Sequence, residues 1–183
     1  QLNKLRYTVF IFEQHLMQQQ PNLCVPLAKS AAPIEIRPAT LADLHAVTVL
    51  EQQVFETAVY PDFFFRQAHD LWPDLLLLAW QEQQLLGYLL AAPGQQGLQS
   101  LGILSLAVIE RSRGLGVGKL LLNYLIQQRP AATRQFWLTV APDNLSALRL
   151  YENLGFIRQK FSEDYYGKGE ARWVLVKHLE ALV

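Results

Sequence analysis

The residues best suited to chemistry in this sequence form one glycine-rich segment, Arg113-Gly114-Leu115-Gly116-Val117-Gly118-Lys119. The segment follows an apolar run at 101–109 and precedes a second apolar run at 120–126. A glycine-rich turn between a strand and a helix leaves backbone N–H groups free at the positive end of the helix dipole, which is an arrangement that holds phosphate. The segment therefore predicts a phosphate-binding loop.

Counting residues excludes two common kinds of phosphate loop. A Walker loop requires glycine five residues before its Gly-Lys pair and Ser or Thr after the pair, but this chain has Arg113 and Leu120 at those places. A dinucleotide-binding loop requires a third glycine three residues after the second, where this chain has Lys119. The remaining pattern is Arg-x-x-Gly-x-Gly, formed by Arg113, Gly116 and Gly118.

A second motif lies about thirty residues downstream of the loop. Residues 144–156 read Asn-Leu-Ser-Ala-Leu-Arg-Leu-Tyr-Glu-Asn-Leu-Gly-Phe, with apolar positions at helical spacing and a glycine suited to end the helix. The two motifs together resemble the signatures of the GNAT superfamily, the acetyl-CoA-dependent N-acetyltransferases. The residues that match the second signature are Asn144, Ala147, Leu150, Tyr151, Gly155 and Phe156.

The resemblance implies that the chain binds acetyl-CoA and transfers its acetyl group to a primary amine by direct attack. The loop amides would cradle the CoA pyrophosphate, and the neighbouring strand would pair with the pantetheine arm. Asn144 would contact the cofactor, although an asparagine after Pro-Asp is also suited to cap a helix. The cofactor-binding residues so implied are Leu106, Ala107, Val108, Arg113, Gly114, Leu115, Gly116, Val117, Gly118, Lys119, Asn144, Ala147 and Tyr151.

Tyr151 is the candidate general acid, because in similar GNAT enzymes this tyrosine points at the CoA sulfur and can protonate the departing thiolate. A phenol with an ordinary pKa of about 10 is a reasonable donor for that step. The alternative is a tyrosine that packs on the core and has no part in the reaction.

The general base is harder to identify. The related ribosomal-protein alanine acetyltransferases carry a glutamate before the asparagine motif, where this chain has Thr139, which cannot act as a base. Some protein N-terminal acetyltransferases place a catalytic glutamate between their first two helices. Glu56 is the counterpart here, and Glu51 is the second choice. Deprotonation through water, with no dedicated residue, is the remaining alternative.

The acceptor is suggested by residues 164–171, which read Asp-Tyr-Tyr-Gly-Lys-Gly-Glu-Ala. This segment is similar to one in protein N-terminal acetyltransferases whose tyrosines line the channel for a peptide's first residues. Tyr165 and Tyr166 are therefore the expected substrate-binding residues, although Ala171 replaces the family's aspartate. We expect the α-amine of a protein or peptide. The alternatives are a small-molecule amine, a catalytically silent acetyl-CoA-binding module, and a phosphate-binding regulator.

The elements that must position these residues alternate as in an α/β (α+β) fold. The resemblance implies the GNAT fold over 34–183, with a mixed central sheet of about six to seven strands flanked by helices. Hydrophobic spacing predicts helices at 40–54, 63–70, 120–128 and 144–154. It predicts strands near 34–38, 75–80, 85–91, 101–109, 136–140, 156–165 and 172–177.

Composition limits the remaining possibilities. The chain has 183 residues, of which 51% are hydrophobic, so it can bury a full core as one domain. Its formal net charge of zero gives no reason to expect a nucleic-acid partner. The single cysteine, Cys24, excludes an internal disulfide, and the histidines lack ligand spacing, so we expect no metal. No apolar run reaches the roughly 20 residues that cross a bilayer, so we expect no membrane partner and a cytoplasmic location.

Residues 1–33 stand apart as an N-terminal extension. Apolar residues at helical spacing predict an amphipathic helix, and Pro21, Pro26 and Pro33 then mark a linker. We expect this extension to pack on the following domain, and the alternative is a contact with a partner or with a second copy in a homodimer.

Overall fold

A seven-stranded mixed sheet forms the centre of the computed structural model, which describes residues 32–55 and 59–180. The strand order is β1-β2-β3-β4-β5-β7-β6, and β4 and β5 are the parallel neighbours. The predicted mixed sheet of six to seven strands is therefore confirmed. The strands are β1 (Glu35–Pro38), β2 (Leu76–Gln81), β3 (Gln84–Gly94), β4 (Gly97–Val108), β5 (Gln135–Val140), β6 (Ile157–Ser162) and β7 (Arg172–His178).

Helices cover both faces of this sheet, as predicted. They are α1 (Leu44–Val54), α2 (Asp62–Leu71), α3 (Val117–Gln128) and α4 (Leu145–Asn153). The first predicted helix begins later than expected, because residues 41–43 form a 3-10 turn. In that turn the Asp43 carboxylate accepts hydrogen bonds from the Thr40 backbone N–H and from Arg37. These bonds provide a partner for the Thr40 amide and for the Arg37 guanidinium at the start of the helix.

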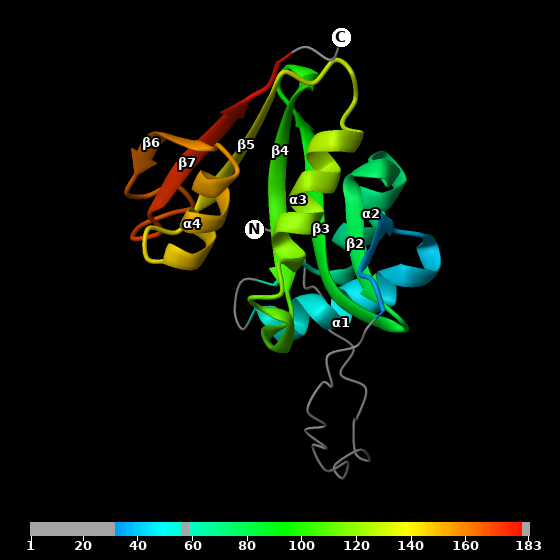
Figure 1. Cartoon of the computed structure of the whole chain (residues 1–183). Coiled ribbons are helices and arrows are strands. Elements are labelled where there is room, and N and C mark those ends of the chain that lie inside the picture. Colours follow the sequence, from blue (N-terminus) through cyan, green and yellow to red (C-terminus); the bar gives the residue numbers. More distant parts are fainter. Residues whose placement is uncertain (1–31, 56–58, 181–183) are drawn as a thin grey trace, which may run out of the picture. The chain divides into compact units, whose positions relative to one another are not determined.

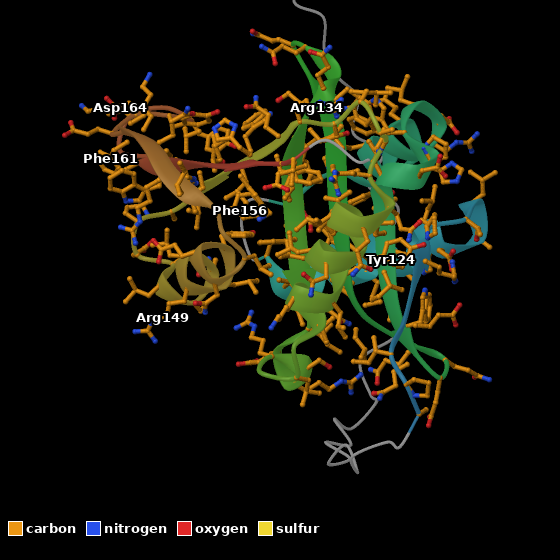
Figure 2. All side chains as sticks on the ribbon, turned by 45° about the horizontal axis from the view of Figure 1, so that its top comes forward. Tyr124, Arg134, Arg149, Phe156, Phe161 and Asp164 are labelled. Atoms are coloured by element: carbon orange, nitrogen blue, oxygen red, sulfur yellow. The ribbon has the colours of Figure 1, made fainter. Side chains whose placement is uncertain are left out.

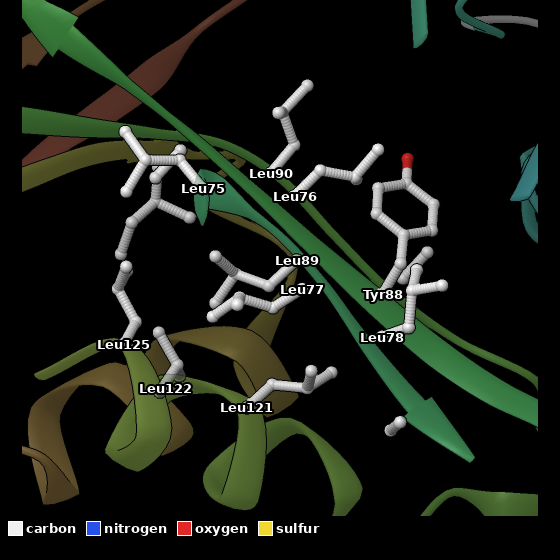
Figure 3. Close-up of a cluster of buried hydrophobic side chains, with 14 of the residues drawn as sticks. Leu75, Leu76, Leu77, Leu78, Tyr88, Leu89, Leu90, Leu121, Leu122 and Leu125 are labelled. Carbon is white, nitrogen blue, oxygen red and sulfur yellow. The ribbon is translucent and has the colours of Figure 1, made fainter. Parts of the chain in front are cut away.

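The two faces of the sheet carry different neighbours. Leu77 and Leu89 point toward Leu121 and Leu122 of α3, whereas the Tyr88 hydroxyl extends to the other side (Figure 3). On that side the Tyr88 ring meets Phe65 of α2 edge-to-face, with 5.4 Å between ring centroids. Because successive side chains of a strand alternate in direction, α3 lies on one face and α1 and α2 lie on the other.

Strands β4 and β5 pair over only part of their lengths. Their parallel register runs from Ser100 opposite Gln135 to Ile103 opposite Leu138, and it ends there. Within the paired part the Trp137 ring covers Gly102, where a Cβ would lie 2.7 Å from the ring. Beyond it the two strands separate, with α3 beside β4 and α4 beside β5 and β7 (Figure 1).

A β-bulge marks the point of separation. Ile103 pairs with Ala91 and Ser105 pairs with Leu90, so Leu104 is the extra residue of β4. A bulge bends its strand and redirects the side chains that follow it. From residue 104 to Val108, β4 is therefore paired with β3 along one edge while its edge toward β5 stays open.

Part of the predicted N-terminal extension, residues 1–31, lies outside the described residues, so its helix and its role in a homodimer stay predictions. Among the residues that the structure describes, no helix is long and apolar enough to span a membrane.

Candidate active site

The glycine-rich loop has the geometry of an anion-binding turn. Gly114 and Gly116 both have φ of +82°, a left-handed conformation that glycine adopts without strain. The first hydrogen bond of α3 joins the Leu120 N–H to the Gly116 carbonyl, at 2.9 Å. The amides of residues 117–119 precede that bond and are free of the helix. The loop around them is exposed, so a phosphate group fits at this helix end.

Gly118 is the point where the predicted cofactor residues come together. A Cβ placed on Gly118 would lie 3.2 Å from Leu150 of α4, 3.6 Å from Leu106 and 3.9 Å from Val108. The loop, the open part of β4 and the second motif are thus neighbours in space. Any larger residue at 118 would press against α4, which explains the glycine in physical terms.

Asn144 caps a helix, one of the two roles weighed for it. Its Oδ1 accepts hydrogen bonds from the Ala147 N–H and the Ser146 hydroxyl, both at 3.1 Å. This is the typical bonding of an N-cap asparagine. A contact of Asn144 or Ala147 with a cofactor stays a prediction.

Tyr151 is buried at the end of α4, with a relative exposure of 7%. Its ring packs edge-to-face on Phe156, which lies at the junction of α4 and β6 (Figure 2). Burial raises the pKa of Tyr151 to about 12. The phenol therefore keeps its proton at neutral pH. Transfer of this proton to a thiolate is energetically unfavourable, because an ordinary thiol has a pKa of about 8.5. The predicted role of Tyr151 as general acid stays a prediction.

Of the two glutamate candidates, the structure describes the second choice. Glu56 lies outside the described residues, and its predicted role as base stays a prediction. Glu51, the second choice, is fully buried in α1. Its carboxylate accepts a hydrogen bond from the Tyr60 backbone N–H at 2.9 Å and another from the Tyr88 hydroxyl at 2.5 Å. The Tyr88 hydroxyl also lies 2.7 Å from the Ser105 hydroxyl.

Tyrosines from two distant parts of the chain approach one another near this carboxylate. We call Tyr60, Tyr165 and Tyr166 the tyrosine cluster. Burial raises the pKa of Tyr60, and the electrostatic influence of Tyr166 and of Glu51 raises it further. The rings of Tyr165 and Tyr166 meet edge-to-face, with centroids 4.8 Å apart. Tyr60 precedes α2, whereas the other two lie between β6 and β7.

One member of the tyrosine cluster, Tyr60, was missed from the sequence, and a residue dismissed as a base, Thr139, contacts the cluster. Tyr60 carried a local signal, since it stands before Pro61 at the N-terminal cap of α2, where the backbone is fixed. Its ring stacks on Phe64, with 4.4 Å between centroids. Thr139 forms a hydrogen bond with the Tyr166 hydroxyl at 3.0 Å, so it helps to hold the cluster.

A pocket of about 530 Å³ lies elsewhere, lined by residues that include Trp72, Leu98, Tyr124 and Gln128. Tyr124 and Gln128 belong to the C-terminal half of α3, whereas the glycine-rich loop is at the N-terminal end of that helix. The pocket is therefore separate from the candidate site. Across residues 32–55 and 59–180, no group of three or more His, Cys, Asp or Glu residues is placed to hold a metal ion.

Comparisons with known proteins place this geometry in a family. The model of the acetyltransferase (GNAT) family matches residues 43–156. An uncharacterised N-acetyltransferase of Methanocaldococcus jannaschii is 31% identical over 144 residues, which cover 78% of this chain and 90% of the relative. An N-alpha-acetyltransferase of Sulfurisphaera tokodaii is 26% identical over 163 residues, or 83% of this chain and 97% of the relative.

Among solved structures, the NatC complex bound to Gag peptide and CoA contains a chain with the same fold. The TM-score is 0.70 at 24% identity, and the match covers 80% of this chain and 99% of its counterpart. Sequence motifs, strand topology and the extent of the family match agree. The chain therefore belongs to the GNAT acetyltransferase family and is an N-acetyltransferase.

Proposed function

We propose that this N-acetyltransferase uses acetyl-CoA to acetylate the α-amine of a protein or peptide in the cytoplasm. One observation carries the proposal. The open edge of β4 lies between the glycine-rich loop on one face of the sheet and the Tyr60 and Tyr166 side chains that interact near the other. A donor bound along this edge would meet an acceptor held by the tyrosines.

The donor side is formed mainly by backbone groups. The amides of the loop would bind the pyrophosphate, and the exposed side chains of Arg113 and Lys119 would add positive charge. The open part of β4, including Leu106, Ala107 and Val108, offers unpaired backbone groups to an extended arm. Acetyl-CoA, when bound, supplies the thioester that the amine attacks. Tyr151 would donate a hydrogen bond on the leaving side, since its burial keeps the phenol protonated.

The acceptor side is formed by side chains with both apolar and polar parts. Tyr166 is 64% exposed and Tyr165 is 37% exposed, so both present surface to a ligand. Tyrosine rings pack on a peptide's first side chains while their hydroxyls bond its backbone. The N-alpha-acetyltransferase relative from S. tokodaii and the peptide in the NatC structure support a peptide acceptor.

The deciding experiment follows CoA release with matched acceptors. Peptides with a free N-terminus should be acetylated, whereas the same peptides with a blocked N-terminus and an internal lysine should not. A set of small amines and polyamines forms the comparison group. Preference for a small amine would contradict the peptide assignment. Tight CoA binding without turnover on any acceptor would favour the binding module instead.

A further inference from the structure

Glu51 is a buried carboxylate that the fold itself does not neutralise. It is 0% exposed, and among the described residues no Lys, Arg or His forms an ion pair with it. Burying a charge without a cation is unfavourable. Such groups occur preferentially where chemistry needs them. The described titratable groups around Glu51 are the Tyr88 hydroxyl, which bonds to it, and the Tyr60 phenol, whose electrostatics it influences. The Phe65 ring of α2 and the Ser105 hydroxyl of β4 contact Tyr88.

The hydrogen bonds around Glu51 have a defined direction. An ionised carboxylate only accepts, and a tyrosine hydroxyl has a single proton to give. Because Tyr88 donates that proton to Glu51 Oε2, its oxygen is left to accept from Ser105. The Ser105 proton thus points toward Tyr88. The free lone pairs of Ser105 Oγ are then available to a donor such as an amine N–H.

Ser105 lies where such a donor would arrive. It follows the bulge residue Leu104, within the part of β4 whose edge toward β5 is open. Its neighbours Leu106 and Val108 approach Gly118 on the α3 side, whereas Ser105 reaches Tyr88 on the α1 side. The same carboxylate binds the Tyr60 backbone N–H, which links these groups to the tyrosine cluster.

We propose that Ser105, Tyr88 and Glu51 form a relay that takes the proton from the acceptor amine. As the C–N bond forms and the thioester C–S bond breaks with its electron pair on sulfur, one proton passes from nitrogen to Ser105 Oγ. The Ser105 proton moves to Tyr88, and the Tyr88 proton moves to Glu51, which becomes a neutral acid. Ser105 is the residue that touches substrate, and Tyr88 and Glu51 act through it as positioning residues. This proposal rests on the proposed acetyl transfer.

The test compares Ser105→Ala with Ser105→Thr, which keeps the hydroxyl. We expect kcat/KM for a peptide to fall by about 100-fold in Ser105→Ala, the lower range for general acid–base catalysis, and to stay within a few-fold of the parent in Ser105→Thr. Glu51→Gln should cause a similar loss. The double variant Ser105→Ala/Glu51→Gln should be no worse than either alone, because residues that act as a unit are not additive.

Controls separate this relay from the proposed function. CoA affinity by calorimetry should be unchanged in every variant, and a merely structural role for Glu51 would lower it together with the melting temperature. If Glu51→Gln does not fold, the Ser105 pair still decides the question. If the parent acetylates an acceptor and Ser105→Ala does so equally well, the relay is wrong and the proposed function stands. No turnover by the parent on any amine would overturn the proposed function as well.

Discussion

The glycine-rich loop and the tyrosine cluster are built in opposite ways. The loop is a continuous stretch of seven residues, and its binding groups are backbone amides at the start of α3. The tyrosine cluster and Glu51 come from α1, the segment before α2 and the β6–β7 connection, and their binding groups are side chains. The two regions also lie toward different faces of the sheet.

This difference assigns separate tasks to the two regions. A site of backbone amides recognises a feature that all its ligands share, and it tolerates changes of side chain but not of backbone conformation. A site of side chains can change its ligand through single substitutions. We therefore expect the loop to determine which donor is bound and the tyrosine cluster to determine which amine is acetylated.

The largest expected effect is on the loop. Gly116→Glu should weaken CoA binding by roughly 100-fold or more, because the left-handed backbone disfavours any side chain and a carboxylate repels phosphate. Calorimetry with CoA measures the change. Gly97→Glu is the matched control, since Gly97 also has positive φ and open space around its Cβ position but lies on the β3–β4 hairpin. Equal losses in both variants would contradict the loop assignment.

Tyr151 is the candidate catalytic group for the reaction between the bound donor and the acceptor. Tyr151→Phe should lower kcat by about 10- to 100-fold with little change in CoA affinity. The pKa of about 12 means that the protonated, active phenol persists at all lower pH values. Tyr151 should therefore produce no basic limb below about pH 10. A limb near pH 9 in the parent that disappears in Tyr151→Phe would contradict this role.

Substitution in the tyrosine cluster should change acceptor binding alone. Tyr166→Phe removes the hydrogen bond with Thr139, an interaction that contributes about 0.5–1.5 kcal/mol. We expect KM for a peptide to rise about 2- to 10-fold, with CoA affinity unchanged. Thr139→Val removes the same bond from the other side and should reproduce the effect. A change in CoA affinity in either variant would contradict the proposal that the loop binds the donor and the tyrosine cluster binds the acceptor.

The smallest effect on activity is expected at Asp43, which lies at the N-terminal end of α1 and bonds to Arg37 and Thr40 rather than to either region. Asp43→Asn weakens bonds to Arg37 and Thr40 and should cost about 1–2 kcal/mol of unfolding free energy, allowing for the partial exposure of Arg37. The Arg37 guanidinium holds the pKa of Asp43 well below its usual range. The stabilisation is therefore complete above the unfolded pKa of about 3.9 and is lost as pH falls below it. Urea unfolding at pH 7 and pH 3 measures this, and unchanged kinetics at pH 7 is the control.

The elements on the donor side could be predicted from the sequence because they are local. Strand, loop and helix follow one another between 101 and 128, so spacing and glycine content are enough to identify them. The sheet and its helices were predicted for the same reason, with errors mainly at element ends such as the turn at 41–43. Asn144 shows the limit of this approach, since one residue pattern fits both a helix cap and a ligand contact.

The acceptor side could not be predicted because it depends on tertiary contacts. Nothing near Glu51 in sequence indicates that its carboxylate meets Tyr88, 37 residues away. The interaction of Tyr60 with Tyr166 likewise depends on how the two halves of the sheet meet. The bulge at Leu104 follows from the register between β3 and β4, which no single strand reveals.

The open part of β4 has a further consequence for how the protein must be kept in solution. Unpaired strand edges recruit other chains and promote aggregation, and here such an edge lies in the middle of the sheet. The bulge at Leu104 gives some protection, because irregular strands are poor templates. A ligand that binds the folded chain alone adds about 2.7 kcal/mol of stability at 100 times its Kd. The resistance of the protein to aggregation in solution should therefore depend on acetyl-CoA, which would occupy the place of a missing strand beside β4.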